Sequence, residues 1–433
     1  MGNGIRISFV ISMARTHHTR QRLKSSLSRS RQLQRRKDQT HNFIQKRHQM
    51  ELQKVIGELE KKFPLRLAEK WDNVGLLVEP TAFGRGEKKV KTVTMTIDLT
   101  EKVLDEAIAN KSDLIFSYHP PIFVALKRLT TREVKERIVI RAIENGIAIF
   151  SPHTSVDSSA GGVNDWLAAG LGESTEVKVV QPYSYQDPNQ ALKVHVFVPE
   201  DAADRVREGL TSITGVASIG SYKQCTFSTK GSGTFFGGEG TNPAVGKKGQ
   251  LERVEELRLE MVCSQSALPQ LREKLYQVHP YETPAWEVVS LQPLPVPATG
   301  QGRLVTLKEP ATLKEMIDRI KRHLGIPHLR LALSETNSES DRVIQPKIKT
   351  VALCAGSGVS VIGKSKADLL LTGEMGHHDV LAATARGSSV ILCEHTNTER
   401  GYLAHLQKEL DQLFEGKVNL LLSKVDADPL VVF

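Results

Sequence analysis

Cysteines, nucleophile motifs and long hydrophobic runs are scarce or absent in this chain of 433 residues. Its four cysteines include no Cys-x-x-Cys pair, which argues against a disulfide framework and favours a reducing compartment. No cysteine has a basic neighbour in the sequence and no Gly-x-Ser-x-Gly motif occurs, so a cysteine or serine nucleophile is not supported. No apolar run approaches the roughly 18 residues that a membrane-spanning helix requires, and we therefore expect a soluble protein with no membrane partner.

Positive charge is in excess, but only at the N-terminus. The net charge of the chain is +9. Residues 1–50 hold twelve Lys or Arg and one acid, Asp38, whereas the other 383 residues hold 46 basic and 48 acidic side chains. Because the body of the chain is nearly neutral, its composition predicts no nucleic-acid surface. Contact with nucleic acid is expected only through the basic segment 1–50.

This basic segment has little hydrophobic periodicity, so we expect it to be disordered. Three interpretations of it remain open. An Arg- and Ser-rich, acid-poor leader is typical of an organelle transit peptide, which would place the protein in mitochondria. The run Arg35-Arg-Lys37 is typical of a nuclear signal or a polyanion contact. The third interpretation, which we slightly favour, is an extension that precedes a start at Met50, with the protein in the cytoplasm and also in the nucleus.

Beyond residue 50, two regions alternate between helix and strand patterns. They predict an α/β fold with two similar αβα lobes, residues 51–188 and 299–433, each with a largely parallel sheet covered on both faces. Ligands bind beyond the carboxyl ends of the strands in such sheets, so polar residues at those ends are the site candidates. The expected strands are 93–97, 114–116 and 147–150 in the first lobe, and 350–354, 368–371 and 389–393 in the second.

The region between the lobes, residues 189–298, has a different order of elements. A β-α-β-β-α-β-like order predicts an inserted ferredoxin-like (α+β) domain, which is suited to subunit contacts or to control of access. A Gly-rich irregular segment at 231–249 interrupts it, and prolines at 293–297 mark its exit. The expected elements are strands 193–198, 257–262 and 286–290 and helices 201–210 and 267–277.

Two pentapeptides follow buried strands in the same way: His153-Thr-Ser-Val-Asp157 and His395-Thr-Asn-Thr-Glu399. Each places an imidazole four residues before a carboxylate, and these two ligand types together suit a divalent cation such as Zn, Mn or Fe. A turn aspartate, or an acidic first helix turn beside a surface histidine, explains either pentapeptide alone about as well. Their repetition at two strand ends favours one shared metal site.

The second pentapeptide precedes an amphipathic helix predicted over 398–413. If Thr396 or Asn397 caps this helix, Glu399 lies in its first turn and faces the same point as His395. His119 stands at another strand end, where the prolines that follow restrict its backbone. A lone histidine in such a position is more often structural, but the convergence of four positions favours a metal.

Polar residues at further strand ends are weaker candidates. Glu374 and His378 follow the predicted strand 368–371, although the ordinary polarity of a helix start explains them about as well. The turn 355–358 has glycines that would let backbone N–H groups cradle a phosphate. It lacks the lysine of a P-loop, so we expect a tight turn.

Six motifs of the chain, in this order, resemble the Nif-three-like family, whose members are often labelled GTP cyclohydrolase type-2 homologues. The similarity spans about residues 51–433, and the inserted region resembles that of the longer, animal-like members, including the segments 246–252 and 279–284. The motifs are Trp71-Asp-Asn-Val-Gly-Leu-Leu77, Ser117-Tyr-His-Pro-Pro-Ile-Phe123, His153-Thr-Ser-Val-Asp157, Gly161-Gly-Val-Asn-Asp-Trp166, Leu371-Thr-Gly-Glu-Met-Gly-His-His378 and Cys393-Glu-His-Thr-Asn-Thr-Glu399.

The resemblance implies a dinuclear centre of divalent metal ions between two similar α/β lobes, in a ring-like homo-oligomer that is commonly a hexamer. By position, the metal ligands would be His119, Asp157, His395 and Glu399. Many bacterial relatives have a second histidine where this chain has Tyr118. Either one of the two ions is then held more weakly, or Tyr118 acts as a poor substitute ligand or as a donor to a neighbouring ligand.

Two functions follow from the resemblance. The first is a metal-dependent hydrolase acting on a nucleotide or related small molecule, in which Glu374, His153 or His378 relays a proton. The second is a noncatalytic interaction protein that binds transcription regulators as a corepressor-type partner and keeps its metal for structure. The predicted fold does not choose between them.

Overall fold

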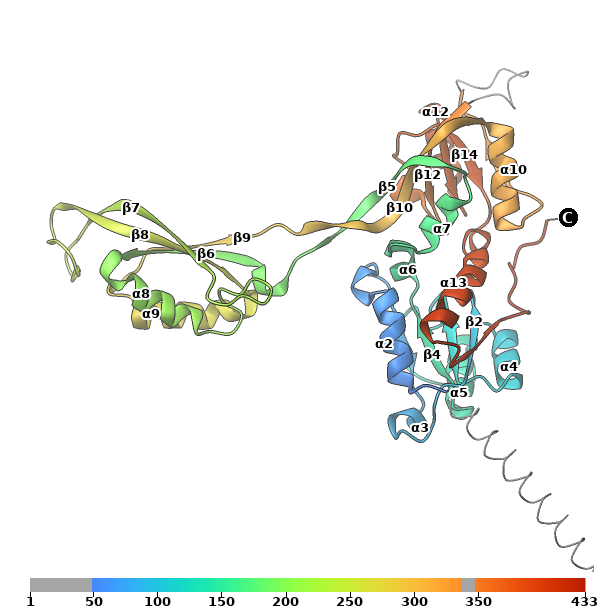
Figure 1. The fold of residues 1–433 in the computed structure, drawn as a ribbon, viewed down its shortest axis with the longest axis horizontal. Coiled ribbons are helices and arrows are strands. Elements are labelled where there is room, and N and C mark those ends of the chain that lie inside the picture. Colours follow the sequence, from blue (N-terminus) through green and yellow to red (C-terminus); the bar gives the residue numbers. More distant parts are fainter. Residues whose placement is uncertain (1–48, 336–346, 433) are drawn as a thin grey trace, which may run out of the picture. The chain divides into compact units, whose positions relative to one another are not determined.

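The computed structural model describes residues 49–335 and 347–432 (Figure 1). The basic segment expected to be disordered lies almost entirely outside the described residues. The chain divides into two compact units: a larger one that comprises the residues up to Gln181 and those from Ala298 onward, and a smaller one, Pro182–Pro297. Among the described residues, no helix has the length and apolar character needed to cross a bilayer.

The first sheet of the larger unit has five strands in the order β1-β4-β3-β2-β15. All neighbours run parallel except β1, which is antiparallel to β4. Helices α2 (Leu52–Lys62) and α13 (Arg400–Leu413) pack on one face, and α4 (Glu101–Ala109) and α5 (Val134–Glu144) on the other, so the central strands are buried on both faces. The strands are β1 Gly75–Val78, β2 Thr92–Thr96, β3 Leu114–Ser117, β4 Ala148–Ser151 and β15 Asn419–Leu422.

The second sheet has six strands in the order β11-β14-β13-β12-β10-β5. Strands β12, β13 and β14 run parallel, while β10 and β11 are antiparallel to their partners. Helices α7 (Val163–Ala169) and α10 (Leu313–Leu324) pack on one face and α12 (His377–Ala385) on the other. The predicted α/β class with largely parallel sheets is thus confirmed. The strands are β5 Ser174–Tyr185, β10 Leu294–Thr312, β11 Arg330–Ala332, β12 Lys347–Cys354, β13 Leu369–Thr372 and β14 Ser389–Leu392.

The two sheets exchange elements that are distant in the sequence. Strand β15 pairs with β2 in the first sheet and α13 covers that sheet, whereas β5 joins the edge of the second sheet. The predicted lobes placed the residues of β5 in the first lobe, residues 51–188, and those of α13 and β15 in the second, residues 299–433. These predictions followed the order of the sequence, because a hydrophobic pattern does not show which strands pair. The segment between β14 and α13, which contains His395 and Glu399, therefore leads from one sheet to the other.

The smaller unit has one antiparallel sheet in the order β7-β8-β6-β9, with α8 and α9 packed against its apolar face. The expectation of irregular structure from residue 231 is wrong for residues 231–236. Gly231 and Gly233 belong to β7 and pair with Glu256 and Val254 of β8, whose ladder outweighs the low strand propensity of glycine. The elements are β6 Leu192–Pro199, α8 Ala203–Thr211, β7 Thr226–Phe236, β8 Leu251–Cys263, α9 Leu268–Val278 and β9 Trp286–Ser290.

Candidate metal centre

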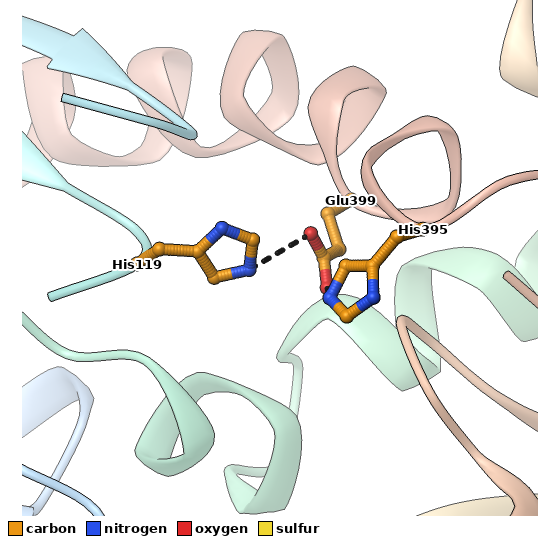
Figure 2. Close-up of side chains that lie close together, drawn as sticks. All are labelled: His119, His395 and Glu399. Atoms are coloured by element: carbon orange, nitrogen blue, oxygen red, sulfur yellow. Dashed lines mark ion pairs between the residues drawn. The ribbon is translucent and has the colours of Figure 1, made fainter. Parts of the chain in front are cut away.

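Three side chains from two segments of the larger unit converge, as Figure 2 shows. One ligand atom from each of His119, His395 and Glu399 lies within 4.8 Å of the other two. Nε2 of His119 is 3.3 Å from Oε2 of Glu399, and Nε2 of His395 is 3.5 Å from Oε1 of the same carboxylate. Two imidazoles and a carboxylate are typical ligands of Zn, Mn or Fe.

The backbone on either side of His119 fixes its position beyond β3. Its N–H donates to the carbonyl of Ile97 (3.0 Å), which extends the ladder between β2 and β3. The hydroxyl of Ser117 donates to the carbonyl of His119 (2.6 Å). Pro120 follows and has no N–H to continue the ladder. The imidazole therefore projects from the point where the strand ends.

Glu399 lies immediately before α13, with φ −119° and ψ −41°, and not in the first helix turn that the sequence predicted. The predicted caps bind elsewhere. The hydroxyl of Thr396 donates to Asp428 (2.8 Å), and the amide of Asn397 donates to the carbonyl of Cys393 (2.9 Å). The carboxylate of Glu399 does not cap the helix either, and it is 3% exposed within the site.

The site has unsatisfied polar atoms at its centre. Nε2 of His119 and Oε2 of Glu399 are buried and, among the described residues, have no hydrogen-bond partner in acceptable geometry. Leaving such an atom unpaired destabilises a fold by about 1–3 kcal/mol. Gly356 (φ +61°) keeps the space beside them open, since a Cβ there would lie 2.8 Å from Oε1 of Glu399 and 3.0 Å from Nε2 of His395. These residues fit a divalent cation.

Each of the three histidines in this region has a carboxylate on its Nδ1. Such a partner fixes the orientation of an imidazole and leaves Nε2 with its lone pair, as second-sphere carboxylates do in metal sites. The Nδ1 to oxygen distances are 2.9 Å for His119 and Asp98, 2.8 Å for His395 and Glu374, and 2.7 Å for His153 and Asp72.

Neighbouring charges raise the pKa of His119 to about 10. Burial alone would lower this pKa, but the hydrogen bond to Asp98 and the contact with Glu399 outweigh burial. The pKa of Asp98 is lowered, because its pairing with His119 exceeds the opposing effect of burial. Without a cation, His119 is therefore protonated at neutral pH and balances the charge of Glu399.

Asp157 lies beside the three-residue group and is not a member of it. It belongs to α6 (Thr154–Ser158), and its Oδ1 accepts a hydrogen bond from the hydroxyl of Tyr118. Burial, and next the charge of Glu399, raises the pKa of Asp157 to about 6. Burial, and next the charge of Asp157, raises the pKa of Tyr118. Tyr118 thus acts as a donor to Asp157, and the role of Asp157 as a metal ligand stays a prediction.

The three predicted proton-relay residues have different surroundings. Glu374 pairs with His395, as described above. The ring of His153 lies 5.3 Å from that of His119, on a backbone with the strained φ of 34°. His378 is exposed at the start of α12, where its ring contact is with His377. Glu374 and His153 therefore adjoin the three-residue group, whereas the described ring contact of His378 points elsewhere.

Two acids that bind histidines of the site, Asp72 and Asp98, were assigned no role from the sequence. Asp98 follows β2 just as His119 follows β3, and parallel pairing of these strands brings the two side chains together. The sequence did not show that β2 and β3 are neighbours, so it did not connect Asp98 with His119. Asp72 has a fully buried side chain and lies in the motif that begins at Trp71, far from His153 in sequence. The motif includes Asp72 but does not show that its partner is His153.

The segment 355–358, where the sequence favoured a tight turn, forms a sharp bend with Gly356 at the positive φ of 61°. Three of its four N–H groups are paired with side chains of the protein, which leaves these three donors without capacity for a phosphate. The pairs are Ala355 to Asn164 (2.9 Å), Gly356 to Thr398 (2.8 Å) and Gly358 to Thr372 (2.9 Å).

An exposed aromatic group borders the site next to His153. The ring centroids of Trp71 and Phe123 are 5.9 Å apart, and they lie 6.0 and 6.3 Å from the imidazole of His153. Trp71 is 60% exposed and Phe123 49%. Apolar ring surface therefore faces solvent within reach of the site.

Comparison with known proteins supports the resemblance seen in the sequence. Residues 50–429 match the family model described as Duf34/NIF3 (NGG1p interacting factor 3). NIF3-like protein 1 of Homo sapiens is 42% identical over 392 residues, which cover 88% of this chain and 93% of that protein. A GTP cyclohydrolase 1 type 2 homolog of Bacillus subtilis is 33% identical over 383 residues, which cover 87% and 97%. The crystal structure of a Bacillus cereus protein related to NIF3 matches with a TM-score of 0.55 and 31% identity, over 88% and 98% of the two chains.

Proposed function

The chain belongs to the Duf34/NIF3 family, and on this premise we propose that it is a metal-dependent hydrolase acting on a nucleotide or a related small molecule. The observation that carries the proposal is the pair of buried atoms, Nε2 of His119 and Oε2 of Glu399, that face each other without hydrogen-bond partners among the described residues. The Bacillus subtilis relative is named GTP cyclohydrolase 1 type 2 homolog, and this name supports a hydrolytic reaction on a heterocycle.

A divalent ion (Zn, Mn or Fe) held by His119, His395 and Glu399 would acidify water and polarise the substrate. Asp98 and Glu374 orient the two imidazoles for such an ion. Each carboxylate binds Nδ1 of its histidine, which directs Nε2 toward the site. Two ions are proposed, and the second would draw on Asp157. Tyr118 holds that carboxylate in place.

His153 is the residue we assign to proton transfer. Asp72 holds its Nδ1, which leaves Nε2 to accept or release a proton beside the three-residue group. Glu374 is occupied by His395, so its proposed role is to position that imidazole. The aromatic edge of Trp71 and Phe123 supports a planar, partly apolar substrate, because rings of this kind stack on aromatic faces.

We also propose a class for the smaller unit, an assembly and a cellular location. The smaller unit is proposed to be a ferredoxin-like domain, supported by the order β6-α8-β7-β8-α9-β9 and the sheet order β7-β8-β6-β9. It would provide subunit contacts in a ring-like homo-oligomer, for which we propose a hexamer. The cytoplasm, and also the nucleus, is the proposed location.

A noncatalytic interaction protein is the second candidate. The family is described as NGG1p interacting factor 3, which supports a role in binding another protein, and we propose a transcription regulator as that partner. In that case the cation would stabilise the fold between the segments that carry His119 and Glu399, and no reaction would depend on it.

The test is the double variant His395→Ala/Glu399→Ala, compared with the wild type in metal content and in hydrolysis of a nucleotide panel. His405 and Glu409 of α13 repeat the spacing away from the three-residue group, with Nε2 3.6 Å from Oε1, so His405→Ala/Glu409→Ala is the control for removing a His–Glu pair. Because Glu409 also pairs with Lys62 of α2, this control reports the effect of a lost surface contact on stability as well. Loss of metal and hydrolysis in the first variant alone, with unfolding and assembly unchanged, supports the hydrolase. If the metal-loaded wild type hydrolyses nothing in the panel and partner binding survives the site variant, the interaction function replaces it.

A further inference from the structure

The smaller unit contains a cavity of about 290 Å³ that we call the hairpin pocket. It lies between the distal half of the β7–β8 hairpin, the loop 237–249 and the segment 281–285. Phe235 and Val254 are among its apolar walls, and Glu256 and Tyr281 supply polar groups. The proposed hydrolase function assigns nothing to this pocket or to the motifs 246–252 and 279–284 that border it.

Two carboxylates fix the loop 237–249 over the hairpin. Glu252 of β8 accepts hydrogen bonds from the backbone N–H of Lys247 (2.8 Å) and from the side chain of Gln250 (2.5 Å). Glu282 accepts one from the backbone N–H of Asn242 (3.1 Å), which ties the same loop to the segment 281–285. The walls of the pocket are therefore joined by specific bonds.

Two glycines lie where an added Cβ would collide with a carboxylate of β8, Glu252 in one case and Glu256 in the other. A Cβ on Gly246, whose φ is +74°, would lie 2.5 Å from Cδ of Glu252. A Cβ on Gly233 would lie 2.7 Å from Oε2 of Glu256. Gly233 pairs with Val254 in the ladder and Glu256 is two residues further along β8, so all three share one face. Glycine at 233 lets the Glu256 carboxylate extend across the wall.

His279 positions the second polar group. Nε2 of this buried histidine donates to the carbonyl of Phe197 (3.0 Å), so Nδ1 accepts the backbone N–H of Tyr281 (3.1 Å). Burial lowers the pKa of His279, which keeps this neutral tautomer. The hydroxyl oxygen of Tyr281 is buried and has no hydrogen-bond partner in acceptable geometry among the described residues. Such an atom is available to a ligand. Burial, and next the nearby carboxylate of Glu256, raises the pKa of Tyr281, so the two polar groups of the pocket lie close together.

The charge of the lining selects one class of ligand. Glu256 and Glu282 line the pocket, and among the described lining residues there is no Lys, Arg or His. A phosphate or carboxylate would meet repulsion there, whereas an ammonium group would meet a carboxylate and a phenol oxygen. The apolar walls suit a hydrocarbon or aromatic body, and aromatic rings also attract cations.

From this geometry we infer that the hairpin pocket binds a small organic ammonium ion with an apolar body, whose N–H groups donate to Glu256 and Tyr281. The site shares no residue with the candidate metal centre and does not depend on the hydrolase proposal. It gives the inserted unit a ligand of its own, of the opposite charge to a nucleotide.

The test uses the full chain and three probes of similar shape: benzylammonium, benzyl alcohol and benzoate. Titrations followed by ligand-observed NMR measure affinity in the wild type, Glu256→Gln and Tyr281→Phe. The control is Glu255→Gln, which removes the same charge from the neighbouring residue on the opposite face of β8. Thermal unfolding and metal content show that the variants remain folded.

We expect benzylammonium to bind the wild type more tightly than either other probe. Glu256→Gln should weaken it by about tenfold or more, since a charge-assisted hydrogen bond is lost, and Tyr281→Phe by a smaller factor. Glu255→Gln should change it by less than about twofold. Equal binding of benzoate, absence of benzylammonium binding at millimolar concentration, or full retention of affinity in Glu256→Gln would each overturn the inference.

Discussion

Nε2 of His119 lies 3.3 Å from Oε2 of Glu399, and among the described residues neither buried atom has a hydrogen-bond partner in acceptable geometry. The two residues come from opposite ends of the larger unit's sequence, one after β3 and one before α13. In the metal-free chain, the proton of His119 balances the charge of Glu399. A proton on Nε2 of His119 and a bound cation therefore compete for the space between this nitrogen and the Glu399 carboxylate.

In the metal-free chain, the pairing of His119 makes stability depend on pH. Its pKa is raised from 6.5 to about 10, so this stabilisation is fully present below about pH 6.5 and is lost as pH rises through about 10. With a chelator present, the difference in Tm between wild type and His119→Gln should change across this range, with the wild type losing relative stability as pH rises. A difference that stays constant from about pH 6 to about pH 10 would contradict the assignment.

Cation binding should release the proton that His119 carries. The apparent affinity should rise with pH, by up to about tenfold per pH unit, until His119 is deprotonated near pH 10. Calorimetric titration of the metal-free chain with Zn²⁺ or Mn²⁺ at neutral pH, in buffers of different ionisation enthalpy, measures the protons released. We expect about one proton fewer for His119→Gln than for the wild type. Equal release would show that this histidine is neutral before binding.

Asp98→Asn should weaken cation binding by about 10- to 100-fold without removing any of the three ligand residues, because the carboxylate orients His119 through Nδ1. Equilibrium dialysis against a metal buffer measures the loss. Asp105→Asn, on the exposed surface of α4, is the control for the change of charge. Unchanged affinity in Asp98→Asn would mean that the hydrogen bond has no role in holding the imidazole for a cation.

Gly356→Ala should abolish cation binding by filling the space beside the ligands. The added Cβ would lie 2.8 Å from Oε1 of Glu399 and 3.0 Å from Nε2 of His395. The positive φ of +61° adds about 1–2 kcal/mol of destabilisation. Gly325→Ala has a similar φ of +69° with no other atom within 4 Å, so it should lose stability and keep its metal. Equal metal content in the two variants would refute the steric argument.

The sequence predicted much of this site because polar residues at the carboxyl ends of parallel strands meet at one edge. His119 and His395 follow this rule. The position of Glu399 did not follow from the sequence, since Thr396 binds Asp428, a residue that no local pattern connects to it. Residues Thr396–Thr398 form a short 3-10 helix, and α13 begins at Arg400, two residues after the expected start.

The same limitation applies to the sheets. Glycine content suggested irregular structure at Gly233, whereas pairing with Val254 makes it part of a strand. No strand was expected at residues 419–422, and β2, the partner of β15, lies more than three hundred residues earlier. Local propensity identifies elements, and long-range pairing decides where they lie.

Asn164 connects the segments on either side of the metal centre, and its removal should affect both stability and the site. Its side chain is buried, donates to the carbonyl of Asp157 (3.0 Å) and accepts the N–H of Ala355 (2.9 Å), next to Gly356. Asn164→Ala leaves two buried backbone groups unpaired, so we expect a loss of about 2–4 kcal/mol in the free energy of unfolding, together with weaker cation binding. Urea denaturation and metal titration measure the two effects. Asn145→Ala removes a comparable amide at an exposed helix end and should cost less than about 0.5 kcal/mol. If both variants unfold alike, Asn164 does not couple the two segments.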